Sequence, residues 1–152
     1  MRRFTAEYLE ATREGMWDDT REALADLSLS TRELVLDAGA GTGELTRILR
    51  EGAPDTVIAF DADTGLLDHV PPPQVAGDAT RLPFRADAFD LVTCQALLVN
   101  LPEPARALEE FARVSADRVA VIEQTTAQSV SIRQSPANRR WRGVPESCIS
   151  TL

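Results

Sequence analysis

The sequence contains no lysine, so all 16 of its basic residues are arginine, against 24 Asp and Glu and a formal net charge of −8. An acidic chain is a poor partner for the phosphate backbone of nucleic acids, because phosphate binding needs clustered cations. No stretch approaches the roughly 18 consecutive apolar residues that a membrane-spanning helix requires. We therefore expect neither a nucleic-acid-binding protein nor a membrane span.

Cysteine is nearly absent as well. The two cysteines, Cys94 and Cys148, lie far apart and lack the spacing of metal ligands, so we expect buried thiols and neither a disulfide nor a metal site. The paired arginines Arg2 and Arg3 are followed by polar and charged residues 5–10, where an export signal has an apolar core. We expect a cytoplasmic protein.

The charge is unevenly distributed along the chain. Residues 1–123 hold 12 Arg against 23 Asp and Glu, whereas residues 124–152 hold four Arg against one Glu. The second segment is rich in Ser, Thr and Gln and has neither the period of a helix nor that of a strand. We divide the chain into an N-terminal helical cap (1–32), a core (33–123) and an atypical tail (124–152) that is either disordered or frameshifted.

Short apolar runs alternate with helical patterns through the core. An alternation of this kind predicts a mainly parallel sheet with right-handed crossovers. The expected fold class is therefore α/β, a Rossmann-like, doubly wound sheet with helices on both faces. We expect strands at 33–38, 56–60, 75–77, 89–94 and 118–123, and helices at 4–14, 18–27, 44–51, 63–69 and 104–114, with Asp63 as an N-cap.

A glycine-rich turn joins the first expected strand of the core to its helix. Gly39, Gly41 and Gly43 alternate there, and glycine lets the backbone approach a ligand where a Cβ atom would collide. A dinucleotide fingerprint needs a further glycine at position 44, where this chain has Glu44. An acid there would repel a pyrophosphate but suits a ligand with an ammonium and a sulfonium group. The turn favours S-adenosylmethionine over NAD, and a plain strand–helix turn remains the alternative.

Further acids follow the next two strands. Asp61 ends the second expected strand, where an acid in a doubly wound fold faces the hydroxyls of a bound ribose. A carboxylate that accepts both hydroxyl protons makes charge-assisted hydrogen bonds. After the third strand, Asp78 can accept a bond from an adenine amino group, and the backbone N–H of Ala79 can reach a ring nitrogen.

The order of these segments resembles a known family. The runs LVLDAGAGTGELT, VIAFDAD, GDATRLPFRADAFDLV and PARALEEFARV are similar to the class I S-adenosylmethionine-dependent methyltransferases, above all to the group that includes the ubiquinone and menaquinone C-methyltransferases. The likeness runs from about residue 33 to 123. It implies S-adenosylmethionine as cofactor, S-adenosylhomocysteine as product and a small-molecule methyl acceptor.

The resemblance also implies a set of cofactor-binding residues. An N-terminal helix often covers the cofactor in such families, and Tyr8, Met16 and Trp17 are candidates for that cover, with plain packing of a terminal helix as the alternative. The implied contacts are Asp37, Gly39, Gly41 and Gly43 at the methionine part, Asp61 at the ribose, Asp78 and Ala79 at the adenine, and Cys94 and Gln95 on the far side.

The chain departs from the family pattern in two places. Asn100 stands where the family commonly has an aromatic residue or histidine, and the one histidine, His69, is expected to be a solvated surface residue, so no catalytic base is predicted. Methyl transfer needs little beyond an aligned nucleophile. The family also continues with a helix and an antiparallel strand pair, a pattern that residues 124–152 lack. We expect a C-terminal truncation or frameshift, with the sheet incomplete at that edge.

Several functions remain open at this point. The first is a methyltransferase acting on a small molecule, and the second is a truncated domain that binds the cofactor without turnover. An NAD-dependent oxidoreductase is disfavoured by Glu44. A purely structural Rossmann-like module is disfavoured by an acid at each of three strand ends.

Overall fold

The computed structural model describes residues 24–53, 55–122, 133–135 and 138–142. The expected helix at 4–14 and most of that at 18–27 lie outside these residues. No helix in the described ranges is long and apolar enough to cross a membrane. Four residues singled out from the sequence also lie outside the described ranges: Tyr8, Met16, Trp17 and Cys148.

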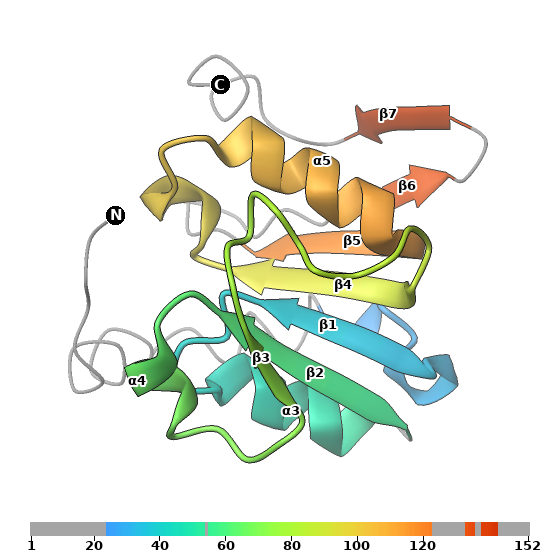
Figure 1. Cartoon of the computed structure of the whole chain (residues 1–152). Helices are drawn as coiled ribbons and strands as arrows, with labels where there is room; N and C mark the ends of the chain where they lie inside the picture. Colours follow the sequence, from blue (N-terminus) through green and yellow to red (C-terminus); the bar gives the residue numbers. More distant parts are fainter. Residues whose placement is uncertain (1–23, 54, 123–132, 136–137, 143–152) are drawn as a thin grey trace.

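The core is a five-stranded sheet in which every neighbouring pair is parallel. The strand order is β3-β2-β1-β4-β5, so the direction of strand addition reverses between β1 and β4 (Figure 1). In open sheets of this kind, ligands bind outside the carboxyl ends of the strands at the reversal. The predicted α/β class is confirmed. The strands are β1 (Leu34–Ala38), β2 (Thr56–Asp61), β3 (Gln74–Ala76), β4 (Phe89–Gln95) and β5 (Ser115–Ile122).

Helices cover both faces of this sheet (Figure 1). The helix α3 (Glu44–Gly52) packs on one face, and α4 (Thr64–Leu67) lies on the same side. The opposite face is covered by α5 (Pro104–Val114). Two short 3-10 turns, η1 (Leu29–Thr31) and η2 (Leu98–Asn100), precede β1 and α5.

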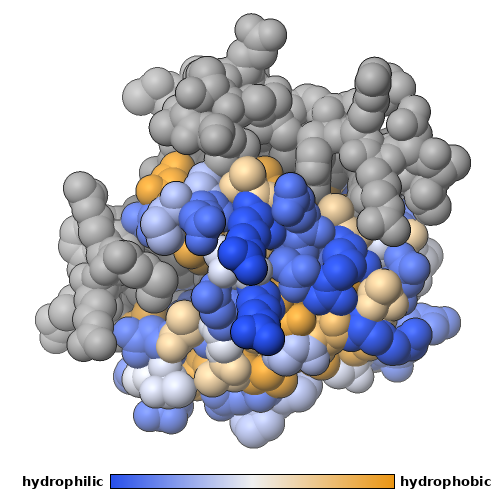
Figure 2. Space-filling model, turned by 45° about the horizontal axis from the view of Figure 1, so that its top comes forward, coloured by the Kyte–Doolittle hydropathy of each residue, from blue (hydrophilic) through white to orange (hydrophobic). Residues whose placement is uncertain are grey.

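Two apolar clusters hold these layers together. On the α5 face, Phe60, Phe89 and Phe111 are almost fully buried, and on the α3 face Val35 and Leu49 are completely buried. In β1, β2, β4 and β5, residues on both faces are apolar, as expected for a parallel sheet covered on both sides. In the view of Figure 2, the visible surface of the described residues is mainly hydrophilic with scattered apolar patches.

Most predicted elements lie within a few residues of the observed bounds. Asp63 caps α4 as predicted, because its Oδ1 atom accepts the backbone N–H of Gly65 at 2.9 Å. The fifth strand differs, since it begins at Ser115 instead of residue 118. Ser115 has an extended backbone and also serves as the C-cap of α5, so the helix passes into the strand without a glycine turn.

The amino ends of three strands are joined by one arginine. The buried guanidinium of Arg32 donates through Nε to the Leu27 carbonyl at 3.0 Å and through Nη1 to the Asp90 carbonyl at 3.1 Å. Its Nη1 atom also pairs with the Asp117 carboxylate, whose side chain is 54% exposed. The backbone N–H of Glu33 donates to Asp90 Oδ2 at 2.7 Å. These contacts fix the starts of β1, β4 and β5.

Residues 124–152 were expected to lack an antiparallel strand pair, but β6 (Arg133–Ser135) and β7 (Asn138–Arg142) form one within this segment. This pair is a separate two-stranded sheet and does not extend the order of the main sheet. Among the described strands, β5 is therefore the last strand on its side of the main sheet.

Candidate functional site

Three acids lie at the carboxyl edge of the sheet, as the sequence predicts. Asp37 is the penultimate residue of β1, Asp61 is the last residue of β2, and Asp78 follows β3 by two residues. Because these strands are parallel, their carboxyl ends meet at one edge. The three side chains differ in environment: Asp37 is 1% exposed, Asp61 is half-buried and Asp78 is exposed.

Asp37 is an interior acid held by two hydroxyl groups. Thr46 on α3 donates its hydroxyl to Asp37 Oδ2 at 2.6 Å, and the Thr93 hydroxyl on β4 is shared between the Leu36 carbonyl at 3.2 Å and Asp37 Oδ1 at 3.3 Å. Buried carboxylates persist only where such donors compensate for lost water. Thr46 could have been found from the sequence, because it is a hydroxyl residue between Leu45 and Leu49 on the buried side of α3.

The glycine-rich turn is tied to the end of β2. The backbone N–H groups of Gly39 and Ala40 donate to the Phe60 carbonyl at 2.7 and 3.0 Å, and that of Gly41 donates to Asp61 Oδ2 at 2.8 Å. The φ angles of Gly39 and Gly41 are 74° and 57°, in the left-handed region that glycine tolerates. The Asp61 carboxylate also accepts the N–H of Asp63 through Oδ1 at 2.9 Å. Asp61 is therefore held from two sides.

Two glycines of the turn make room for the chain's own side chains. A Cβ atom at Gly39 would lie 2.9 Å from the side chain of Leu97, and one at Gly43 would lie 2.8 Å from Val70. The glycine pattern predicted that this space faces a ligand. Leu97 and Val70 were not predicted, because a glycine pattern does not indicate which distant side chain packs against it.

The Gly77–Ala79 segment continues the edge beyond β3. The backbone N–H of Gly77 donates to the Asp61 carbonyl at 2.9 Å, which places the segment beside the end of β2. The hydroxyl and N–H of Thr80 donate to Asp78 Oδ1 at 2.7 and 2.8 Å and hold the pKa of Asp78 below its usual value. Asp78 is thus ionised and oriented, and Ala79 is 7% exposed.

Cys94 and Gln95 lie across the strand reversal from the glycine turn. Ala38 pairs with Cys94, and the next residues along the chain are Gly39, which follows β1, and Gln95, the last residue of β4. Cys94 is buried in the cluster on the α5 face, and the alternation of a strand turns Gln95 to the opposite face. Gln95 is 3% exposed, and its amide nitrogen and oxygen have no hydrogen-bond partner within the described part of the chain.

The turn after β4 uses Asn100 structurally. Ala96 has a φ angle of 49°, which is strained for a residue with a side chain. Its carbonyl accepts the side-chain amide of Asn100 at 2.8 Å, and its N–H donates to the Ile122 carbonyl at 2.9 Å. These bonds direct Leu97 over Gly39. Asn100 stabilises the turn, and an amide cannot act as a base.

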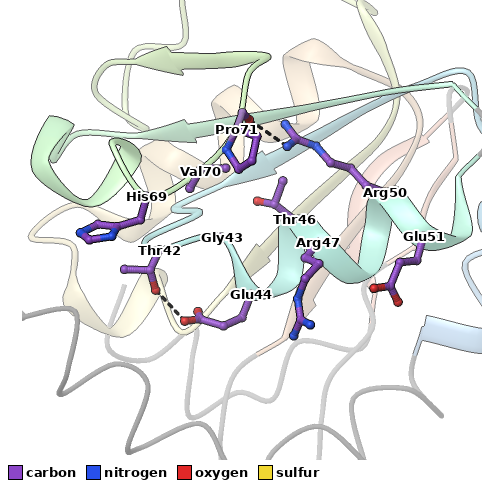
Figure 3. A pocket seen from close by; sticks show the side chains of 10 residues that line it. All are labelled: Thr42, Gly43, Glu44, Thr46, Arg47, Arg50, Glu51, His69, Val70 and Pro71. Atoms are coloured by element: carbon purple, nitrogen blue, oxygen red, sulfur yellow. Dashed lines mark hydrogen bonds between the residues drawn. The ribbon is translucent and has the colours of Figure 1, made fainter.

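A groove of about 390 Å³ lies between α3 and the His69–Pro71 segment that follows α4 (Figure 3). Its lining includes Glu44, whose Oε1 atom accepts the Thr42 hydroxyl at 2.6 Å, and His69, which is exposed as predicted. Of the predicted cofactor residues, Gly43 alone lines it, so the groove is distinct from the edge that carries the acids. The lining residues are Thr42, Gly43, Glu44, Thr46, Arg47, Arg50, Glu51, His69, Val70 and Pro71.

A second charged pair lies on α5. Arg113 donates to both carboxylate oxygens of Glu110, from Nε at 2.7 Å and from Nη2 at 2.8 Å. This contact lowers the pKa of Glu110 from its ordinary 4.5, and it raises the pKa of Arg113. Glu110 also accepts the backbone N–H of Leu82 at 2.7 Å.

The Glu110 contact predicts a pH-dependent stability. Because the folded-state pKa is depressed, the contribution is present above 4.5 and is lost as the pH falls below that value. Glu110→Gln is expected to lower the free energy of unfolding by roughly 0.5–1 kcal/mol near neutral pH and by much less near pH 3.5, as measured by urea unfolding. The lowered pKa of Asp78 also makes stability depend on pH, but its contribution is the same in the wild type and in Glu110→Gln and cancels when the two free energies are subtracted. An equal gap at both pH values would contradict the assignment.

Comparisons with known proteins agree with this architecture. A family model described as "Methyltransferase domain" matches residues 36–122. A demethylmenaquinone methyltransferase of Mycobacterium sp. (strain KMS) is 40% identical over 99 residues, which cover 62% of this chain and 42% of that protein. One of Lactiplantibacillus plantarum is 37% identical over 107 residues, covering 62% and 45%. The chain spans less than half the length of either relative.

Solved structures show the same fold. A SAM-dependent methyltransferase from Aquifex aeolicus superposes with a TM-score of 0.68 at 19% identity, covering 89% of this chain and 80% of that one. A [4+2]-cyclase superposes with a TM-score of 0.59 at 23% identity, covering 69% and 44%. Likeness at this level of identity concerns the fold, and the fold carries more than one chemistry.

Proposed function

This chain belongs to the S-adenosylmethionine-dependent methyltransferase family, and from that premise we propose that the carboxyl edge of its sheet binds the cofactor and that its methyl group goes to a small-molecule acceptor. When bound, S-adenosylmethionine supplies an electrophilic methyl carbon on a sulfonium.

The observation that carries the proposal is the buried amide of Gln95. A buried polar group without a partner costs about 1–3 kcal/mol, so such a group in a folded protein calls for an explanation. Gln95 is the residue beside Gly39 at the strand reversal, and its amide can both donate and accept. The amino-acid end of the cofactor, with a carboxylate and an ammonium, offers partners for both atoms.

The remaining contacts follow from the order of the strands. Each oxygen of Asp61 accepts one backbone N–H and keeps a lone pair, so the carboxylate can still accept two ribose hydroxyls. Asp78 and the N–H of Ala79 are assigned to the adenine. Asp37 would support the glycine turn from the interior of the domain, because its carboxylate is bonded to Thr46 on α3 and Thr93 on β4. Gly39, Gly41 and Gly43 shape the turn, and Cys94 supports it from the core.

The catalytic contribution proposed for this chain is alignment. The amide of Asn100 holds the Ala96 carbonyl, so η2 supplies no proton acceptor. Holding a nucleophile in line with a reactive carbon lowers the barrier without a base. Leu97 covers Gly39 with an apolar surface that keeps water from the turn. The net charge of −8 supports a small-molecule acceptor over a nucleic acid. We also propose a cytoplasmic location, because residues 5–10 are polar and charged where an export signal has an apolar core.

Calorimetry tests the proposal directly. We expect S-adenosylmethionine and S-adenosylhomocysteine to bind with Kd values on the order of micromolar and NAD to show no binding. Release of S-adenosylhomocysteine in the presence of an acceptor then separates an enzyme from a domain that binds without turnover. Binding of NAD in place of the two sulfur compounds would refute the assignment.

A further inference from the structure

The loop between β3 and β4 runs from Gly77 to Ala88 without helix or strand. Most connections in compact domains have about 4–6 residues, so this loop is long, and long loops often carry a function. This loop begins with Asp78 and Ala79, the residues proposed to recognise adenine. The side chain of Asp78 accepts hydrogen bonds from Thr80 in the same loop. These bonds do not hold the middle of the loop against the rest of the domain.

Glu110 and Arg113, which we call the α5 clamp, hold the middle of this loop. Glu110 Oε2 accepts the N–H of Leu82 at 2.7 Å, and Arg113 Nη2 donates to the Leu82 carbonyl at 3.0 Å. Arg113 Nη1 donates to the Phe84 carbonyl at 2.8 Å, and the Arg113 carbonyl accepts the N–H of Asp87 at 3.0 Å. The clamp thus bonds the backbone of the loop at three residues.

A chain of contacts leads from the clamp back to the carboxyl edge. The ring of Phe84 meets that of Phe60 edge-on, with centroids 5.9 Å apart and an interplanar angle of 64°. The Phe60 ring in turn lies against Gly77, since a Cβ atom at Gly77 would be 2.7 Å from Phe60 Cζ. Gly77 immediately precedes Asp78 in the chain. Displacing Phe84 would therefore disturb the support beneath the proposed adenine contacts.

We propose that Glu110 and Arg113 are positioning residues for adenosyl recognition, because they hold the Leu82–Phe84 segment whose packing on Phe60 supports Asp78 and Ala79. This inference rests on the proposed function and names which end of the cofactor depends on α5. Packed side chains and hydrogen bonds of this kind transmit effects between sites over several residues.

The test compares two arginines with matched contacts. Arg113→Met removes the clamp, and Arg32→Met removes an arginine that likewise bonds two backbone carbonyls and one carboxylate, but at the amino ends of the strands. Affinities for S-adenosylhomocysteine and for 5′-methylthioadenosine, which lacks the amino acid, are measured by calorimetry at a temperature where circular dichroism shows each variant folded. We expect Arg113→Met to weaken both ligands about tenfold and Arg32→Met to change them less than about twofold.

A double-mutant cycle that combines Arg113→Met with Asp78→Ala measures the coupling free energy between the two residues in ligand binding. General destabilisation does not change this quantity. The two substitutions are expected to be less than additive, because they act on the same contact. Wild-type affinity in Arg113→Met, an equal loss in Arg32→Met, or full additivity would overturn the inference. If Arg113→Met does not fold, Glu110→Gln replaces it, and unchanged affinity there overturns it too. A wild-type protein that binds neither ligand would instead refute the proposed function.

Discussion

Asp61→Ala is expected to weaken binding of S-adenosylhomocysteine by about 1.5–3 kcal/mol, roughly 10- to 150-fold in Kd, the usual range for hydrogen bonds to a charged group. The physical reason is that Asp61 is fixed by the N–H groups of Gly41 and Asp63 and so presents its free lone pairs in one direction. Alanine removes both acceptors for the ribose. Calorimetry at constant salt concentration measures the change.

Two further variants separate ribose contact from loosening of the glycine turn. Asp68→Ala removes an exposed carboxylate at the end of α4, so its affinity should match that of the wild type. Asp61→Asn keeps one acceptor oxygen and should fall between wild type and Asp61→Ala. If Asp61→Ala binds as tightly as the wild type, Asp61 does not belong to the site.

Arg32→Met is expected to give the largest loss of stability, about 3 kcal/mol in the free energy of unfolding, or roughly 6–12 °C in Tm. Methionine fills most of the volume but leaves the buried carbonyl of Leu27 and the half-buried carbonyl of Asp90 without their donor. An unsatisfied buried acceptor carries the full cost of its lost hydration. Urea unfolding followed by circular dichroism measures this loss.

The matched control is Asp117→Asn at the other end of the same ion pair. Asp117 is 54% exposed, so water can replace Arg32 as its partner, and the expected cost is less than about 1 kcal/mol. The two variants therefore test whether the carbonyl bonds or the ion pair provide the stability. Equal losses in both would assign the stability to the ion pair and contradict the prediction.

The positions of the acids could be predicted from the sequence because they depend on local patterns. Short apolar runs fix where β1, β2 and β3 end, and parallel pairing brings those ends to one edge whatever the details of packing. The sequence pattern alone was enough to predict that Asp37, Asp61 and Asp78 lie at this edge. The Asp63 cap was equally local, since an N-cap bonds within its own first turn.

What surrounds those acids depends on contacts between distant residues. The pairs Leu97 with Gly39 and Phe60 with Gly77 join segments that only the folded sheet brings together. The fifth strand was predicted to begin at residue 118, and its first three residues were missed because Ser115, Ala116 and Asp117 do not form an apolar run. Here Ser115 ends the helix by entering the sheet, where it pairs with Phe89.

The role given to Glu44 shows a limit of motif reasoning. Its acidity was used to argue against a pyrophosphate ligand, which assumes that the side chain faces the ligand. In the structure its carboxylate accepts the Thr42 hydroxyl and lines the groove between α3 and the His69–Pro71 segment (Figure 3). A residue's place in a motif fixes its backbone position, and the direction of the side chain depends on its neighbours.

The bonds between the glycine turn and β2 have a consequence for the kinetics of ligand capture. Since Gly39, Ala40 and Gly41 are all anchored to Phe60 and Asp61, the turn and the acid form one preorganised unit. Binding to a preorganised surface costs less conformational entropy than binding that must first order a loop of the protein. Association at this edge should then be a single fast step, with affinity differences among analogues expressed mainly in their dissociation rates.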